Sequence, residues 1–480
     1  MNVYESLTHP VALTVFIITL ALPVLIGLIA MKKTHNQSDF LIGGRGMSKF
    51  VVALSAVSSG RSSWLVLGVS GMAYTMGVGA VWAVVGYILV EMLQFVLIGQ
   101  RLRMQTGTMK SLTLLDYFES RFKDSSHLIR ITGAAILIIF VTAYVAAQFN
   151  AGSKSLSMAL NLPMTGSLCI SALLILIYMV LGGFIAVAYN DVVRAIIMIV
   201  GLIIFPAYVM LKVGSVQLLF SSLAALNPSL INPFALGAGA IIGFLGIGLG
   251  SPGQPHILVR YMAIQDANQL RWSTVIGTVW NVGMAWGALF IGLLGRYVFP
   301  AVEALPDQDA EMIYLVLSSR YFGPAMYGLL IGGIFAAILS TADSQLLVVA
   351  STVVRDLYEK TIKKGAISEN DKLKLSRWVV ILSGVIAMIL AYVAKDLIFW
   401  LVLFAWGGLG ASFGPAIICS LYWKGTTKWG ILAGMITGTV VTIIWKLFLK
   451  TPTGIYELIP AFALALVAIA VVSKCTPSQK

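Results

Sequence analysis

The segment Ser55-Ala56-Val57-Ser58-Ser59-Gly60-Arg61-Ser62-Ser63-Trp64 places five serines, a glycine and an arginine inside a long apolar stretch. A helix that faces lipid does not carry such a run, because a charge near the bilayer centre costs at least about 2.5 kcal/mol on insertion scales. Arg61 is therefore expected to have a partner or a function. Small hydroxyl residues beside glycine also suit a helix that is broken in mid-membrane, where freed backbone groups can bind ions or solute. The alternative is an ordinary close contact between helices.

The composition around this segment is that of a membrane protein with many spans. Of 480 residues, 59% are hydrophobic and 11% are charged, which excludes an ordinary soluble domain. The formal net charge of +13 does not indicate a nucleic-acid partner, because the cations cluster in short loops between apolar segments, as topology signals do. The three cysteines and four histidines show no metal-site spacing. We expect a lipid-embedded transporter, with no enzymatic activity, no cofactor and no obligatory protein partner evident.

Apolar segments of about 20 residues, the length that crosses a bilayer, recur about 13 times. They lie near 11–31, 50–75, 80–99, 131–153, 163–184, 191–213, 233–255, 273–296, 325–353, 377–394, 397–422, 429–449 and 456–473. If the N-terminus is outside the cytoplasmic membrane, the loops richest in Lys and Arg all lie inside, together with the C-terminal tail. The opposite loops hold fewer cations and an acidic group that includes Glu303 and Asp309.

A second broken helix is expected in the glycine-rich span near 233–255, which contains seven glycines between residues 237 and 253. Irregular backbone survives at membrane depth only where it lines a cavity or is buried in protein. The spacing of this span from 50–75 fits two repeats of five helices, 50–213 and 233–422. With a leading helix at 11–31 and trailing helices within 429–473, the chain forms a single transporter domain over 1–480.

A third polar cluster lies in the span that contains residues 334–350. Ala337, Ser340, Thr341 and Ser344 fall on one face at helical spacing, and hydroxyl and carbonyl oxygens suit Na⁺ better than a soft metal. Asp343 stands one step around that face and needs a cation, for which Arg61 is the intramembrane choice. Hydroxyls bonded back to their own helix are the alternative, but this leaves the aspartate unexplained.

Two further polar features lie outside these clusters. Glu91 is an acid within an apolar span, and the residues assign it no role. The stretch from Thr113 to Phe122 alternates aromatic and charged residues and is expected to be an interfacial anchor.

Together these features resemble the sodium/solute symporter family, and within it the bacterial sodium/proline carriers. The resemblance runs from Arg45 to about Pro460. It depends on motifs that include Ser55 to Trp64, Gly182-Gly183-Phe184, Gly253-Gln254-Pro255-His256, Ser340-Thr341 and Phe413-Gly414-Pro415. It implies an all-α, leucine-transporter-like fold of 13 spans: one leading helix, an inverted five-plus-five repeat and two trailing helices. Such a fold works by alternating access to a site at the middle of the membrane.

The resemblance also implies site residues. A principal sodium site would use backbone carbonyls at Ser58, Arg61 and Ala337 and the hydroxyls of Ser340 and Thr341. A second cation site, or a proton site, would use a set of three residues. These are Asp191, Asp343 and Ser344. The substrate region would include residues from the two broken spans and from the span 131–153. These are Ser62, Trp64, Tyr144, Ile247, Ser251 and Gln254.

The chain also departs from the proline carriers, which have an aspartate at Gly60, an apolar residue at Arg61, a tryptophan at Ile247 and a tyrosine at Ser251. A guanidinium about 4 Å from a bound cation would oppose it by about 4 kcal/mol at an effective dielectric of 20. Two functions therefore stay open. One is cation-coupled, most simply Na⁺-coupled, symport of proline or another small solute. The other is a sodium-independent or proton-coupled carrier of a different substrate, in which Arg61 replaces the ion or clamps a substrate carboxylate.

Overall fold

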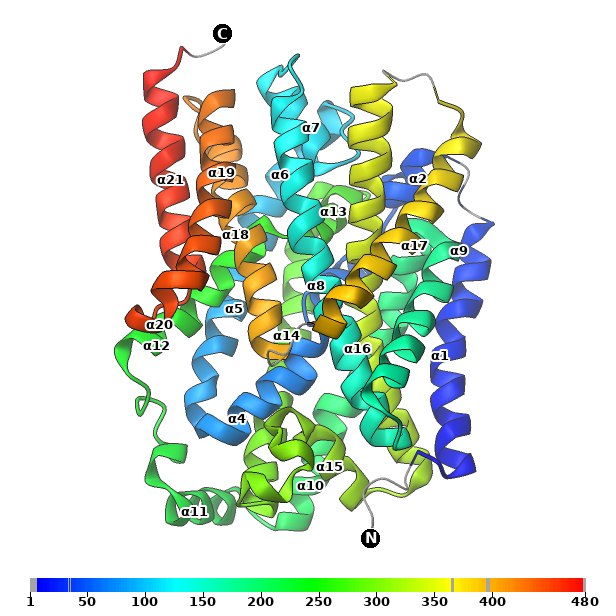
Figure 1. The fold of residues 1–480 in the computed structure, drawn as a ribbon, viewed down its shortest axis with the longest axis vertical. Helices are drawn as coiled ribbons and strands as arrows, with labels where there is room; N and C mark the ends of the chain where they lie inside the picture. Colours follow the sequence, from blue (N-terminus) through cyan, green and yellow to red (C-terminus); the bar gives the residue numbers. More distant parts are fainter. Residues whose placement is uncertain (1–6, 33, 35, 364–366, 394–397, 478–480) are drawn as a thin grey trace.

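The structure is a computed structural model that describes residues 7–32, 34, 36–363, 367–393 and 398–477. It is a helical bundle (Figure 1), and within these residues the β pairing is a lone bridge between Met47 and Ile264. We call the end that holds α10, α11 and α15 the lower face, and the end that holds α7 and the last turn of α21 the upper face.

Ten of the described helices are long and apolar enough to cross a membrane. The expected spans 50–75, 163–184 and 233–255 match the shorter apolar helices Lys49–Ser59, Met164–Leu176 and Ala238–Gly253. The principal elements are α1 (Pro10–Met31), α2 (Gln37–Ile42), α3 (Lys49–Ser59), α4 (Ser70–Met76), α5 (Val81–Gln94), α6 (Gln100–Thr108), α7 (Leu114–Phe122), α8 (Leu128–Leu160), α9 (Met164–Ile199), α10 (Phe205–Val213), α11 (Val216–Leu226), α12 (Ala238–Leu245), α13 (Pro255–Ala263), α14 (Leu270–Val298), α15 (Ile313–Tyr321), α16 (Pro324–Ser351), α17 (Glu369–Val393), α18 (Ile398–Tyr422), α19 (Lys428–Ile444), α20 (Lys450–Thr453) and α21 (Leu458–Cys475).

Both interruptions expected from the sequence are present. The helix α3 ends at Ser59, and the chain continues through Gly60 and Arg61 into a π-helical turn over Trp64–Val69 and then α4. The helix α12 passes into a 3₁₀ segment over Gly246–Gly253 before α13 begins.

The glycines of the second interruption allow close contact with two neighbouring helices. A β carbon on Gly250 would lie 2.0 Å from Nε1 of Trp406 on α18, and one on Gly248 would lie 2.2 Å from the Gly86 carbonyl on α5. Contacts this short exclude any larger side chain unless the neighbour moves. The glycine density therefore reflects backbone packed against protein, as irregular structure at membrane depth requires.

The helix α9 is divided at Gly183, whose φ of +59° is not helical. The expected spans 163–184 and 191–213 fall on its two parts and on their continuation through α10. A β carbon at Gly183 would lie 2.6 Å from Cδ2 of Phe40, so the break brings α2 against α9.

The helix α16 lies near the centre of the bundle and contacts α1, α3, α8 and α9. Its residues from Ile334 to Leu347 are buried, which places the expected polar cluster inside the protein. By contrast, apolar side chains such as Trp378 and Leu382 on α17 are exposed and form part of a surface suited to lipid.

The trailing helices α19 and α21 pack through small residues. Gly430 and Gly434 lie one turn apart on α19, and a β carbon on Gly434 would lie 2.3 Å from Cγ1 of Ile469 on α21. Small residues at this spacing allow two helix backbones to approach closely, which is how helices associate where the hydrophobic effect gives no drive.

The helix α7 corrects one expectation. Leu115, Tyr117 and Phe118 are buried within the protein, so the prediction of an interfacial anchor between Thr113 and Phe122 is wrong. Asp116 and Arg130 of α8 form an ion pair of 2.9 Å, which draws this amphipathic stretch against the bundle. Sequence alternation could not show which face of the stretch meets protein.

Candidate ion and substrate sites

The first break faces the hydroxyl cluster of α16. The Ser340 hydroxyl donates to the carbonyls of Ser58 at 3.1 Å and Ala337 at 2.9 Å. The Thr341 hydroxyl donates to the Ser59 carbonyl at 2.8 Å. Both hydroxyls are fully buried. The end of α3 and the middle of α16 therefore bring neutral hard oxygens together at one point, the donor set that a sodium ion accepts.

This arrangement brings together Ser58, Ala337, Ser340 and Thr341 of the expected cation site and adds the Ser59 carbonyl. The backbone N–H of Arg61 donates to the Ser58 carbonyl at 3.1 Å. The Ser340 and Ser344 hydroxyls also bond back to α16, at Ala337 and at the Ser340 carbonyl. These hydroxyls thus bond both within their own helix, as the alternative interpretation expects, and across to Ser58 and Ser59 at the end of α3.

Arg61 points away from this cluster. Its Nε donates to Oδ1 of Asn281 on α14 at 2.7 Å, and its Nη2 lies 3.5 Å from Oε2 of Glu91 on α5. The guanidinium carbon lies 3.5 Å from the ring centre of Tyr87. The expectation that Arg61 pairs with Asp343 is therefore wrong: its partner is Glu91, which the sequence had left without a role.

This pairing changes the electrostatics expected at the break. The Arg61 charge is offset by a buried carboxylate, and Asn281 also donates to Glu91. The Tyr87 hydroxyl donates to the Gly60 carbonyl at 3.1 Å, and a β carbon on Gly60 would lie 2.3 Å from that hydroxyl. An aspartate at position 60 would thus require Tyr87 to move.

The expected second site is a network of ion pairs. Asp343 accepts from Nη1 of Arg194 at 2.5 Å, and that nitrogen lies 3.4 Å from Asp191. Nη2 of Arg260 lies 3.1 Å from Asp191 and donates to the Ser344 hydroxyl at 2.5 Å. The four charged groups are at most 1% exposed, and their formal charges cancel.

Three of the six expected substrate residues line a small central cavity. Trp64, Tyr144 and Ile247 surround a space of about 10 Å³ together with Tyr87 and Trp406, close to the minimum for one water molecule. The Trp64 ring is stacked on Tyr87, with centroids 5.8 Å apart. The cavity is occluded by its own aromatic side chains.

Other expected substrate residues lie at the edge of this cavity or behind it. The Ser62 and Tyr144 hydroxyls are 3.5 Å apart. Gln254 donates to the carbonyls of Gly250 and Trp406, at 3.1 and 3.0 Å, so it ties the 3₁₀ segment to α18. Ser251 is buried in the same segment and does not line the cavity.

Comparisons with known proteins identify the family of the chain. Residues 40–438 match the model of the sodium:solute symporter family. The osmoregulated proline transporter OpuE of Bacillus subtilis is 37% identical over 94% of this chain and 92% of its own length. The chain belongs to the sodium:solute symporter family. A sodium/proline symporter of Escherichia coli is 35% identical over 94% of this chain and 90% of its own.

Solved structures place this family member in a known fold. A Na⁺-coupled sialic acid symporter, solved in a substrate-bound outward-open state, aligns with a TM-score of 0.80 at 18% identity and covers 98% of this chain and 99% of its own. MhsT in complex with L-phenylalanine aligns with a TM-score of 0.54 at 14% identity, covering 89% and 98%. The family match and the relatives, which are named as transporters, identify the chain as a multi-pass membrane transporter rather than an enzyme. Cation-coupled symport of a small solute is confirmed, and the sodium-independent alternative is not favoured.

Sequence reasoning about this symporter missed several polar residues, although their signal was visible. Arg194 lies within an apolar span and Arg260 lies beside one. The cost of burying their charges indicates that each has a partner or a function, by the same argument that applies to Arg61. Asn281 is a lone amide inside the expected span 273–296. Tyr87 and Trp406 had no such signal, because aromatic residues are ordinary in helices that face lipid or protein.

Proposed function

We propose that this chain couples the entry of Na⁺ to the uptake of proline, or of a small solute close to it, across the bacterial cytoplasmic membrane. The observation that carries the proposal is the contact between the end of α3 and the hydroxyls of Ser340 and Thr341 on α16. The relatives named as proline transporters support the choice of substrate.

The proposed sodium site uses oxygens from two separate helices. Carbonyls of Ser58, Arg61 and Ala337 would join the hydroxyls of Ser340 and Thr341. An ion held there favours the arrangement in which α3 and α16 are together, because a ligand stabilises the state for which it has the higher affinity. Gly60 and Trp64 follow directly on the chain and line the central cavity. Ion binding would therefore favour a particular shape of the substrate site, which is the physical content of coupling.

The proposed substrate site is the aromatic cavity beside the break. Its lining is apolar and aromatic, which suits the pyrrolidine ring of proline, and the broken-helix ends offer backbone polar groups for a zwitterion. Ile247, which lines this cavity, stands where proline carriers have a larger tryptophan. The site would therefore admit a solute somewhat larger or more polar than proline.

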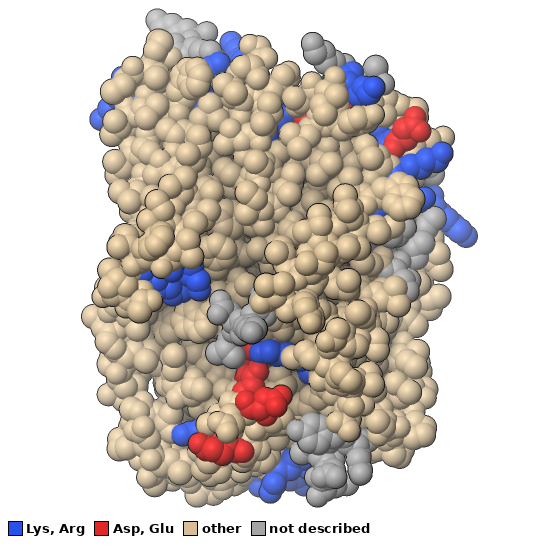
Figure 2. Space-filling model, in the orientation of Figure 1, with Lys and Arg blue, Asp and Glu red and all other residues tan. Residues whose placement is uncertain are grey.

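The proposed architecture completes this scheme. We count 13 crossings, with 50–213 and 233–422 as inverted repeats, one leading helix at 11–31 and trailing helices within 429–473. The lower face is outside and the upper face is cytoplasmic, because basic residues cluster in the upper loops. In Figure 2 most acidic side chains of the visible face lie in its lower third and most basic ones lie near its upper end, with some of each sign elsewhere.

Uptake of radiolabelled proline into proteoliposomes tests the proposal. We expect uptake driven by an inward Na⁺ gradient and not by an equal K⁺ gradient. Thr341→Val removes a hydroxyl of the proposed ion site at nearly constant volume. It should raise the Na⁺ concentration that gives half-maximal uptake at least about tenfold, which corresponds to a loss of about 1.4 kcal/mol in binding free energy. Thr442→Val is the matched control, because that buried hydroxyl bonds to its own helix on α19. Equal uptake with Na⁺ and K⁺ would contradict sodium coupling.

A further inference from the structure

The buried network around Asp191 and Asp343 does not fit a second sodium ion. Both oxygens of Asp343 are engaged, one by Arg194 at 2.5 Å and one by the Ser344 hydroxyl at 3.2 Å. One oxygen of Asp191 accepts from Ser55 at 2.6 Å and lies 3.1 Å from Arg260. Each carboxylate that a second cation would use thus already has a guanidinium partner, and the Asp343 oxygen that Arg194 does not contact accepts from a hydroxyl.

The charge balance leads to the same conclusion. Two carboxylates and two guanidiniums, each at most 1% exposed, sum to zero. A sodium ion added to this site would be an uncompensated buried charge. At about 4 Å from a guanidinium it would be opposed by about 4 kcal/mol at an effective dielectric of 20.

Arg194 is the group that bridges the two carboxylates. It lies on α9 one turn after Asp191, at 3.4 Å, and crosses to Asp343 on α16. Arg260 contacts Asp191 from another helix, α13, and also bonds to the Ser55 hydroxyl at 3.0 Å and to the His256 carbonyl. Arg260 therefore also ties α13 to α3, whereas Arg194 bridges the two acids directly.

We infer that Arg194 is a tethered cation that permanently takes the place of a second sodium ion, so that this transporter binds one sodium ion per cycle. The inference depends on the proposed sodium coupling and deepens it, because it names the residue that sets the number of coupled ions. Removing the Arg194 charge leaves one carboxylate uncompensated among hard oxygen donors: Asp191, Asp343 and the hydroxyls of Ser59 and Ser344. Such a site selects Na⁺ by charge and by ligand type.

Binding of ²²Na⁺ to purified full-length protein in detergent, with saturating proline, tests the inference at pH 7 and at pH 9. We expect one bound ion for the parent protein and two for Arg194→Gln. The Hill coefficient of Na⁺-dependent uptake should rise from about one toward two. The matched control is Arg194→Gln with Asp343→Asn, which removes one charge of each sign and should again bind one ion.

The outcomes separate this inference from the proposed function. A parent protein that binds no sodium contradicts the proposed function. A parent that binds two ions overturns the inference and leaves the function intact, and this measurement requires no variant to fold. An Arg194→Gln protein that elutes as the parent does and still binds one ion at both pH values also overturns it.

Discussion

The upper and lower faces of this symporter close over the centre of the bundle by different means. At the upper face, Arg130 of α8 joins Asp116 at 2.9 Å, Glu119 at 2.5 Å and also Asp356, while Arg355 joins Asp116 at 2.7 Å. At the lower face, one lysine, Lys154 of α8, contacts Asp309 at 2.8 Å and Glu311 at 3.0 Å. The ion pairs at the upper face thus involve two arginines and three acids on several elements. Those at the lower face are formed by one lysine with two acids.

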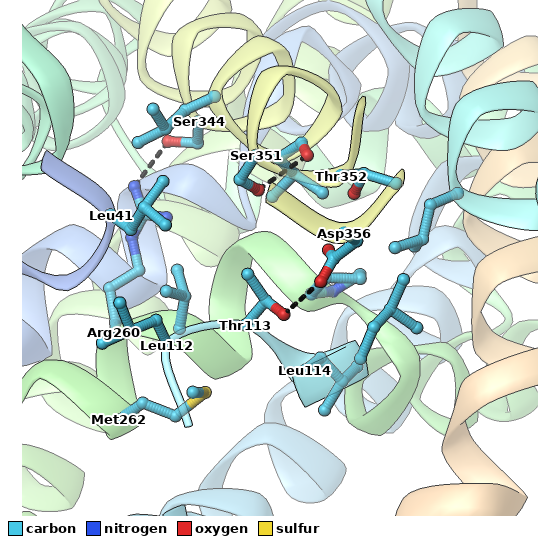
Figure 3. Close-up of a pocket in the computed structure, with 16 residues that line it drawn as sticks. Leu41, Leu112, Thr113, Leu114, Arg260, Met262, Ser344, Ser351, Thr352 and Asp356 are labelled. Carbon is cyan, nitrogen blue, oxygen red and sulfur yellow. Dashed lines mark hydrogen bonds between the residues drawn. The ribbon is translucent and has the colours of Figure 1, made fainter. Parts of the chain in front are cut away.

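The cavities near the two faces also differ in volume. Close to the upper cluster, a cavity of about 40 Å³ runs between Asp356 and the Arg260–Ser344 pair (Figure 3). The lower face holds a cavity of about 650 Å³ that includes Lys154 and Asp309 in its lining. The cavity near the upper face is therefore small and lies beside several ion pairs, whereas the cavity at the lower face is larger and is lined by Lys154 and its partner Asp309.

Hydrogen bonds and ring stacking connect the lower contact to the proposed substrate cavity. Glu311 accepts hydrogen bonds from the first backbone N–H groups of α18, those of Ile398 at 3.2 Å and Phe399 at 2.9 Å. An acid at a helix N-terminus stabilises that end of the helix. The Phe399 ring is stacked on Trp64, with centroids 6.1 Å apart. Opening the lower contact would thus free an aromatic ring that packs on Trp64, a residue of the cavity lining, and we expect the lower face to be the easier one to open.

Breaking the upper cluster should have the largest effect. Arg130→Met leaves Asp356 and its neighbours as buried acids without their main cation, and losing one partner of a buried pair costs about 3–5 kcal/mol. We expect a large fall in the yield of folded protein and in its unfolding temperature in detergent. Both are measured by size-exclusion chromatography and thermal scanning.

Two variants calibrate that result. Arg130→Lys keeps the charge but cannot contact three carboxylates as a planar guanidinium does, so its unfolding temperature should fall between those of the parent and Arg130→Met. Arg121→Met removes a neighbouring cation that bonds to a carbonyl at 3.4 Å and should change little. An Arg130→Met protein as stable as the parent would show that the upper cluster does not hold this face closed.

Breaking the lower contact should shift the conformational equilibrium more than the stability. Lys154→Met keeps a long apolar side chain and removes two ion pairs. A change of about 1–2 kcal/mol alters the ratio of two states about 5- to 30-fold. We expect a cysteine at Val402, which lines the central cavity, to react that much faster with a thiol reagent added at the lower face. The native cysteines Cys169, Cys419 and Cys475 are replaced by serine for this assay.

The control for the lower contact is Lys212→Met. Lys212 is an exposed lysine on α10 that lies 5.4 Å from the ring of Tyr208. Its substitution therefore removes a positive charge from the same face and leaves the ion pairs of Lys154 intact. Equal labelling in Lys154→Met and the parent would refute the assignment of Lys154 as the group that holds the lower face.

The sequence predicted a bundle of many apolar helices and both helix breaks, because each depends on local composition; ten of the described helices are long enough to cross a membrane. A run of about 20 apolar residues crosses a bilayer wherever it stands, and Gly60 or Gly250 interrupts a helix within one turn of itself. The pattern at Ser340 and Thr341 also predicted the correct face of α16, since helical spacing fixes which residues share a side.

The partner of Arg61 could not be predicted in the same way. Glu91 and Asn281 lie on two other helices, α5 and α14, and their approach depends on how each helix is rotated about its axis. Asp343 was the acid expected for Arg61, but the structure places Arg194 beside it. A charge in an apolar span shows that a partner exists, but only the packing of helices shows which one.

The smallest effect is expected for Asp124, in the loop between α7 and α8 at the upper face. It tests this loop apart from the Arg130 ion pairs. Burial alone would raise the pKa of Asp124, but hydrogen bonds from Ser126 and the N–H of Ile129, together with Lys428 at 3.7 Å, lower that pKa below its usual value. A carboxyl whose pKa is lower in the folded state stabilises the protein above its unfolded pKa of about 3.9 and loses this contribution as the pH falls. Asp124→Asn should therefore cost about 1 kcal/mol at pH 7, in the range of lost helix caps.

The difference in unfolding temperature between the parent and Asp124→Asn should shrink as the pH is lowered from 7 to 3.5, and thermal scanning in detergent measures it. Asp307→Asn, at an exposed position on the lower face, is the control and should show little difference at any pH. A constant difference across this range would mean that Asp124 acts through packing and not through its charge. The capping contribution would then be independent of pH, and acid sensitivity of the upper face would have to arise in the Arg130 cluster.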